Sequence, residues 1–331
     1  MTIKDSQPVS YSRTTRTSTF LVRVALTIAI LAYLFSKIGL RPAVSGFLSA
    51  RKEYVIVAFV LVMVMQAVTA HRLKLLIEGQ GIPISTFEMV KINLASSFYA
   101  SFLPGGNITG MAIRFYKISH TTRMYTAVIV SLLIDRLLAT LSLCGVGLTL
   151  WIFDPSVAPG PSLLLLLLST MVLTVICVLP WCPPARKRLK RVLSANWCTR
   201  GSSFFQKAMD AIEVFPKLSS RSMFRLLALS LLAQLLGVAC YYLLARALGL
   251  GIPLLTIGWI RSVVVLVTMI PVSVSGIGVR EVSLVTLFSP YGVSGSDALG
   301  YSFLVFGITV LVVGLVGGLI DCMQWLFPRD A

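Results

Sequence analysis

The chain contains several apolar stretches long enough to cross a lipid bilayer, and these limit its fold more than any other feature. A spanning helix needs about 20 predominantly apolar residues. Apolar segments occupy residues 19–36, 54–77, 86–103, 124–153, 162–181, 222–248, 254–271, 282–289 and 298–326. Only 12% of the residues are charged, against about 25% in an average soluble domain. We therefore predict an all-α polytopic membrane protein, a single integral domain over residues 1–331 with about seven or eight transmembrane helices.

Two of these segments, 86–103 and 254–271, end in helix-breaking residues within the apolar region. The predicted turn residues are Pro104, Gly105, Gly106 and Gly110 after the first segment, and Pro271, Gly276 and Gly278 after the second. A helix that stops inside a bilayer leaves backbone groups unpaired, which is tolerated only where protein or water lines the break. We therefore predict that both segments are re-entrant or broken helices.

The landmarks around the two breaks recur in the same order. The sequence Gly-Gln-Gly-Ile-Pro at 79–83 returns as Gly-Leu-Gly-Ile-Pro at 249–253, 170 residues later. In each case a basic residue, a helix-breaking proline and an arginine follow, which are Lys91, Pro104 and Arg114, then Arg261, Pro271 and Arg280. A glycine and a proline after a helix are common anywhere, but this ordered series predicts two repeats, at 54–153 and 222–326. Three complete crossings between the breaks would invert the second repeat, as in many secondary transporters.

The basic residues lie mostly beside the apolar segments. The formal net charge is +17, and Lys and Arg next to spanning helices favour the cytoplasmic side. This rule places the tail at 1–18, the loop at 182–221 and the C-terminus in the cytoplasm, although the basic loop at 37–52 disagrees. Residues 185–225 fit either an amphipathic helix on the inner leaflet or a solvated loop. Because attraction to lipid head groups explains the charge, we expect membrane lipids as partners and no nucleic acid.

Asp135 and Arg136 lie near the centre of segment 124–153. Charged residues there cost about 2.5–3.5 kcal/mol each on insertion scales, so they are either functional or an ion pair that joins helices. Neighbours on a helix point about 100° apart, so we expect that they do not pair with each other. Arg114 or Arg280 is the expected partner of Asp135.

Arg114 and Arg280 each follow a glycine-containing break. A break followed by a helix start suits an anion, and a guanidinium matches phosphate geometry. The alternative is that each arginine extends to the lipid head groups at the interface. Glu281 either holds Arg280 or is a protonatable group. His71 and His120 lie far apart, and we predict no metal, no cofactor and no catalytic residue.

Three motifs resemble a known family. They are LPGGNITGMAIRFYKIS at 103–119, SLLIDRLLATLSL at 131–143 and IPVSVSGIGVREVSLV at 270–285. They resemble the flippase-like membrane family related to the transmembrane region of lysylphosphatidylglycerol synthases, over about residues 20–325. The matching positions are Pro104, Gly105, Gly106, Gly110, Arg114, Asp135, Arg136, Pro271, Gly276, Gly278, Arg280 and Glu281. Met111 and Ala112 depart from the pattern, since the family often has an acidic residue there.

The resemblance implies a multi-pass protein of the plasma (inner) membrane that handles a lipid with a polar head group, such as an aminoacyl-phospholipid or a polyprenyl-phosphate-linked glycan. We expect a flippase or lipid transporter, with the head group held between inverted repeats by Arg114, Arg136, Arg280 and Glu281, and with Asp135 as counter-charge. The soluble aminoacyl-transfer domain of the full synthases does not occur in the sequence, so we expect no synthase activity from this chain alone. The alternatives are a membrane-embedded transferase and an accessory subunit for a soluble or membrane enzyme.

Overall fold

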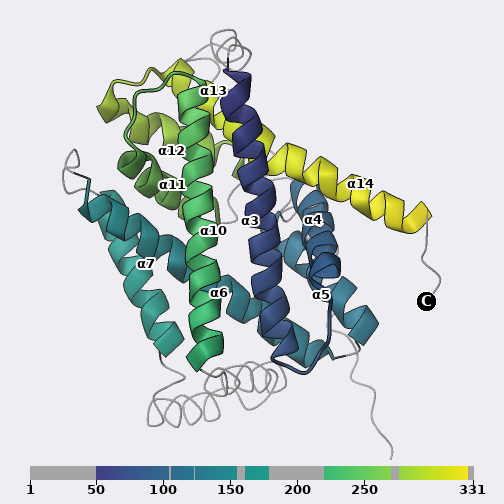
Figure 1. Cartoon of the computed structure of the whole chain (residues 1–331). Helices are drawn as coiled ribbons and strands as arrows, with labels where there is room; N and C mark the ends of the chain where they lie inside the picture. Colours follow the sequence, from purple (N-terminus) through teal and green to yellow (C-terminus); the bar gives the residue numbers. More distant parts are fainter. Residues whose placement is uncertain are drawn as a thin grey trace, which may run out of the picture.

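The computed structural model in Figure 1 describes residues 50–103, 106–122, 124–154, 161–178, 220–269 and 276–326. Within these ranges the chain is all helical, with no strand, which confirms the predicted class. The tail at 1–18, segment 19–36, nearly all of the loop at 182–221, and Pro104, Gly105 and Pro271 lie outside the described residues.

The helices follow the apolar segments closely, except α5, which lies between two of them. They are α3 (Lys52–Glu78), α4 (Thr86–Phe102), α5 (Asn107–Thr122), α6 (Tyr125–Ile152), α7 (Pro161–Val178), α10 (Ser220–Ala247), α11 (Leu254–Met269), α12 (Val279–Phe288), α13 (Gly295–Phe306) and α14 (Val313–Leu326). A short turn of 3-10 helix, η4 (Ser289–Tyr291), follows α12, and a π-helical stretch, η5 (Gly307–Val312), joins α13 to α14. In the described part of the chain, four helical stretches are long and apolar enough to span a membrane: Lys52–Glu78, Tyr125–Ile152, Arg221–Ala247 and Gly295–Met323.

Two long helices, α3 and α10, lie side by side at the centre of the molecule (Figure 1). They run in opposite directions: the start of α3 lies beside the end of α10, where the backbone N–H of Arg51 donates to the carbonyl of Ala247 (2.9 Å). At the other end of the pair, Leu75 of α3 and Leu226 of α10 line the same cavity. Large apolar side chains are exposed on the outer helices, among them Leu164, Leu168 and Met171 of α7, as expected of a surface that faces lipid.

The turns after α3 and α10 have the same backbone structure. Gly81 and Gly249 both have positive φ angles, 81° and 74°, which glycine adopts without steric cost. The next residue in each turn, Ile82 or Leu250, donates its N–H to a carbonyl five residues earlier. These two turns, and the starts of α4 and α11, are separated by 168 residues. Each copy of the motif has two glycines, and the left-handed one is the second in the first copy (Gly81) but the first in the second copy (Gly249). The predicted alignment of Gly79 with Gly249 is therefore wrong by two residues.

Each short helix, α4 or α11, packs against the long helix that closes the other half of the chain. Gly317 of α14 lies against the backbone carbonyl of Leu94 in α4, and Gly147 of α6 lies against the side chain of Ser262 in α11. A Cβ at either glycine would collide with these atoms. Gly314, Gly317 and Gly318 of the last apolar segment predict close helix packing, because small residues let helices approach, and the structure confirms it: Gly314 faces Ser101 and Gly318 faces Phe98.

Candidate functional site

Asp135, in the middle third of α6, forms a buried ion pair with Arg72 of α3. The Nε of Arg72 donates to Oδ1 of Asp135 (2.7 Å), and its Nη1 donates to Oγ of Ser230 in α10 (3.1 Å). Arg72 and Asp135 are 2% and 8% exposed. This contact joins the three central helices α3, α6 and α10.

The expectation that Arg114 or Arg280 pairs with Asp135 is therefore wrong. Arg72 lies near the end of segment 54–77, where the positive-inside rule counts it among the basic residues on the cytoplasmic side. In the structure its side chain points into the bundle, while Lys74, two residues on, is near the surface and pairs with Glu78 (3.2 Å). Residues two apart on a helix point about 200° apart, so Arg72 faces the core when Lys74 faces the surface.

Two further arginines, Arg114 and Arg136, lie near this ion pair. Arg114 of α5 is half-buried and donates from Nε to Oγ of Ser96 (2.8 Å). Arg114 and Arg136 both lie close enough to Asp135 and Arg72 to interact electrostatically. Arg136 is exposed and does not pair with Asp135, as the helix geometry predicts. We call Arg72, Arg114, Arg136 and Asp135 the arginine cluster, which has three cations, one anion and two positive charges in excess.

Arg280 and Glu281, at the start of α12, form a separate buried pair. Nη2 of Arg280 donates to Oε1 of Glu281 (2.5 Å), and its Nε donates to Oγ of Ser302 in α13 (2.9 Å). The same Oε1 accepts the hydroxyl of Ser302 (2.7 Å), and Oε2 accepts the backbone N–H of Gly278 (2.6 Å). Glu281 therefore holds Arg280, and Gly278, with a φ of 89°, shapes the turn. The positive charge of Arg280 and the negative charge of Glu281 cancel, and Ser302 and Gly278 add none.

The two arginines that follow the breaks do not occupy equivalent places. Arg280 is in the first turn of α12, whereas Arg114 lies two turns into α5, which begins at Asn107. Only Arg280 is thus at a helix start. Of the other turn residues, Gly106 and Gly276 have positive φ angles, 52° and 76°, and Gly110 packs against Ala100 of α4.

Sequence reasoning assigned no site role to Arg261 of α11. It is 7% exposed, its Nη1 donates to Oε1 of Gln234 in α10 (3.0 Å), and its guanidinium lies over the ring of Tyr241 (5.4 Å). Among the described residues its Nε has no hydrogen-bond partner. A charged residue in the middle of an apolar helix is the signal that identifies it, but the repeat alignment makes it the counterpart of Lys91, which is half-buried.

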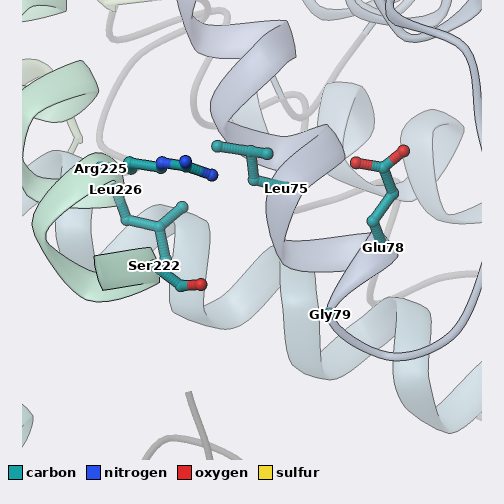
Figure 2. Close-up of a pocket in the computed structure, with 6 residues that line it drawn as sticks. All are labelled: Leu75, Glu78, Gly79, Ser222, Arg225 and Leu226. Carbon is teal, nitrogen blue, oxygen red and sulfur yellow. The ribbon is translucent and has the colours of Figure 1, made fainter. Parts of the chain in front are cut away.

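A cavity of about 270 Å³ lies between the end of α3 and the start of α10 (Figure 2). Its lining is formed by Leu75, Glu78, Gly79, Ser222, Arg225 and Leu226. Leu75 is three residues beyond Arg72, and Leu226 is four residues before Ser230, so the cavity is about one helical turn from the Arg72–Asp135 pair. It lies at the end of the bundle nearest to that pair. In the described ranges no three His, Cys, Asp or Glu side chains lie together; the absence of a metal stays a prediction.

The spanning helices and the charged clusters buried between them define a multi-pass helical membrane protein. The family model described as "Lysylphosphatidylglycerol synthase TM region" matches residues 20–317. The chain belongs to this family, as its three motifs predicted, and it is a lipid-related membrane protein. Neither the curated proteins nor the solved structures contain a match.

Proposed function

We propose that this protein is a flippase or transporter for a lipid whose polar head group contains a phosphate, and that the arginine cluster binds that phosphate. The observation that carries this proposal is the excess of positive charge in the arginine cluster. Uncompensated charge in a membrane segment is costly and marks binding sites. A phosphate oxyanion entering the cluster would offset the excess.

Arg114 is the proposed principal ligand of the phosphate. A guanidinium has five N–H donors, and Arg114 uses its Nε for Ser96, while neither of its Nη atoms donates to a described residue. The two Nη groups form a fork that matches two phosphate oxygens. Arg136 adds a second cation, and the Arg72–Asp135 pair holds the surrounding helices at a fixed separation.

We assign Arg280 and Glu281 a different part in the same pathway. Their hydrogen bonds with Ser302 and Gly278 satisfy one another, so Arg280 is not free to hold a head group in this conformation. We propose that the pair stabilises the second break at the edge of the lipid path. Its disruption would alter the turn rather than remove a ligand.

The proposed mechanism is alternating access between two inverted repeats. Three observations support it: α3 and α10 are antiparallel, the turns that follow them have the same backbone structure, and each broken helix packs against the closing helix of the other half. In this mechanism the head group crosses between the repeats while the acyl chains stay in the bilayer. The proposal includes seven or eight crossings, an inner-membrane location, and cytoplasmic placement of both termini and of the basic loop at 182–221.

The substrate classes that fit are a polyprenyl-phosphate-linked glycan and an aminoacyl-phospholipid, since both contain a phosphate. The family's description as the membrane region of a synthase favours one second candidate, an accessory subunit that presents lipid to a separate enzyme. The two candidates differ in whether the chain alone moves lipid between leaflets.

Reconstitution tests this. Purified protein in liposomes should accelerate the exchange of a fluorescent phosphatidylglycerol between leaflets, measured by chemical quenching of the outer leaflet. Arg114→Gln should slow the exchange roughly tenfold or more, since a hydrogen bond to a charged group contributes about 1.5–3 kcal/mol.

Arg246→Gln is the matched control, because Arg246 is an exposed arginine at the opposite end of α10 and should leave the rate unchanged. Exchange equal to that of empty vesicles across anionic and zwitterionic lipids would contradict transport and leave the accessory role. Equal loss in Arg114→Gln and Arg246→Gln would contradict the assignment of the site.

A further inference from the structure

The two halves of the molecule contain the same glutamine contact with different partners. In the first half, Nδ2 of Asn93 in α4 donates to Oε1 of Gln66 in α3 (3.0 Å). In the second half, Nη1 of Arg261 in α11 donates to Oε1 of Gln234 in α10 (3.0 Å). Gln234 and Arg261 each lie 168 residues after Gln66 and Asn93, which is also the separation of the two turns. Arg261 is thus the structural counterpart of a neutral asparagine.

A second difference makes room for the larger side chain. Thr69 accepts a hydrogen bond from Asn93 in the first half (3.3 Å), and its counterpart 168 residues later is Gly237. The guanidinium of Arg261 lies directly against Gly237, where any Cβ would overlap its Nη2, Cζ and Nε atoms. The pair of differences, Asn to Arg and Thr to Gly, therefore forms one matched arrangement for a buried guanidinium.

The charge of Arg261 has no counter-ion within the described ranges of the chain. Arg72 has Asp135 and Arg280 has Glu281, but Arg261 has only the neutral Gln234 and the ring of Tyr241. Its Nε is buried and without a partner. Buried polar groups nearly always have partners, and an unpaired buried charge is strongly unfavourable. The fold does not require this charge, because the equivalent helix contact forms with Asn93.

Arg261 lies next to the arginine cluster along the contact between α6 and α10. Gln234, which binds Arg261, is one helical turn beyond Ser230, which binds Arg72, so the two contacts are about 6 Å apart along α10. On α6 the same step leads from Asp135 to Ala139, whose carbonyl accepts Nε2 of Gln234 (3.0 Å). A polar path thus continues from the cluster to Arg261.

We propose that Arg261 forms a second oxyanion site, which takes the phosphate of the lipid head group after Arg114. This rests on the proposed function and adds a second position on the path. The ligand is a phosphate oxyanion, which would reach the unpartnered Nε of Arg261 when α10 and α11 separate. Gln234 positions the guanidinium through Nη1, and Gly237 leaves the space that it needs.

The structure itself suggests the variant that tests this site. Gly237→Thr combined with Arg261→Asn gives the second half the Gln–Asn–Thr arrangement of the first half, so the protein should fold. The test is made in an Arg114→Gln background, which removes the proposed principal ligand of the arginine cluster and so weakens binding at the first site. Purified protein in non-ionic detergent is titrated with dihexanoylphosphatidylglycerol and, separately, with inorganic phosphate, and affinity is measured by calorimetry.

We expect the added pair of substitutions to weaken binding of the short-chain lipid roughly tenfold or more. A parallel loss for inorganic phosphate identifies a site for the phosphate alone, and a loss confined to the lipid identifies a head-group site. Arg261→Lys, which keeps the charge, should retain most of the affinity. Unchanged affinity for both ligands in a folded protein would overturn the proposal.

Arg261→Gln with Gly237 intact is the second variant, used if the first does not fold. Affinity for both ligands equal to that of the Arg114→Gln protein would then overturn the proposal. The outcome is separable from the proposed function. Binding that depends on Arg261 in a protein that moves no lipid between leaflets would support this site and contradict transport. Transport without such binding would contradict this site alone.

Discussion

The two halves of this membrane protein share a backbone plan but differ in where they hold charge. In the first half the glutamine partner is the neutral Asn93, and the buried ion pair joins separate helices, Arg72 of α3 with Asp135 of α6. In the second half the partner is the charged Arg261, and the ion pair joins neighbours in sequence, Arg280 and Glu281. The shared plan is therefore a matter of helix packing, and the differences between the halves lie where we propose that a charged ligand binds.

The largest expected effect comes from removing the carboxylate of the first half. Asp135→Ala leaves Arg72 buried without its partner, which should lower the free energy of unfolding by about 3–5 kcal/mol. Thermal unfolding of purified protein in detergent measures the change. Arg136→Ala is the control, since Arg136 is exposed on the next position of the same helix and should change stability little.

A double variant tests whether the unpaired charge of Arg72 causes the loss of stability. Replacing both partners, as in Arg72→Met with Asp135→Leu, should recover much of the lost stability, because apolar residues can substitute for a buried ion pair. If the double variant is no more stable than Asp135→Ala, the unpaired charge of Arg72 is not the cause of the loss.

A smaller effect is expected from the glycines that mediate packing between the halves. Gly147→Ala and Gly317→Ala each place a Cβ on the opposing helix, so each should destabilise by about 1–3 kcal/mol. Gly145→Ala is the control because nothing lies within 4 Å of its added Cβ, and alanine in a helix gains up to about 1 kcal/mol over glycine. If Gly147→Ala matches this control while Gly317→Ala does not, the correspondence between the two contacts is wrong.

The smallest effect concerns a partly exposed ion pair between the two halves. Asp321 of α14 accepts the hydroxyl of Tyr99 in α4 (2.7 Å) and pairs with Lys117 of α5. Because the ion pair is partly exposed, Asp321→Asn should cost about 1 kcal/mol or less. Thermal unfolding measures it, and a loss as large as that of Asp135→Ala would remove the distinction between buried and partly exposed pairs.

Much of the fold was predictable because bilayer spans depend on local composition. The predicted segment 124–153 is α6 at 125–152, and 222–248 is α10 at 220–247. The separation of Asp135 from Arg136 followed from helix geometry alone. The glycines of α14 were also recognised, since small residues permit close approach wherever they occur.

The partners across helices were not predictable in the same way. Which face of α3 turns toward α6 depends on the packing of the whole bundle, so the sequence identifies Arg72 only as a basic residue on the cytoplasmic side. The counterpart of Arg261 was misassigned to Lys91 because Gly-x-Gly-Ile-Pro permits a slip of two residues, and the positive φ of Gly81 resolves it. That shift is what shows Asn93 and Arg261 in equivalent contacts.

The sidedness of the two turns shows whether the two halves have opposed orientations in the membrane. A protease-cleavable tag is inserted at Gly81 in one protein and at Gly251 in another, both exposed positions in turns between helices. Cleavage is then compared in right-side-out and inverted membrane vesicles. Two inverted repeats predict that the Gly81 tag is cut only from the cytoplasmic face and the Gly251 tag only from the opposite face. Cleavage of both tags from one face would contradict the inversion, and with it alternating access between the halves.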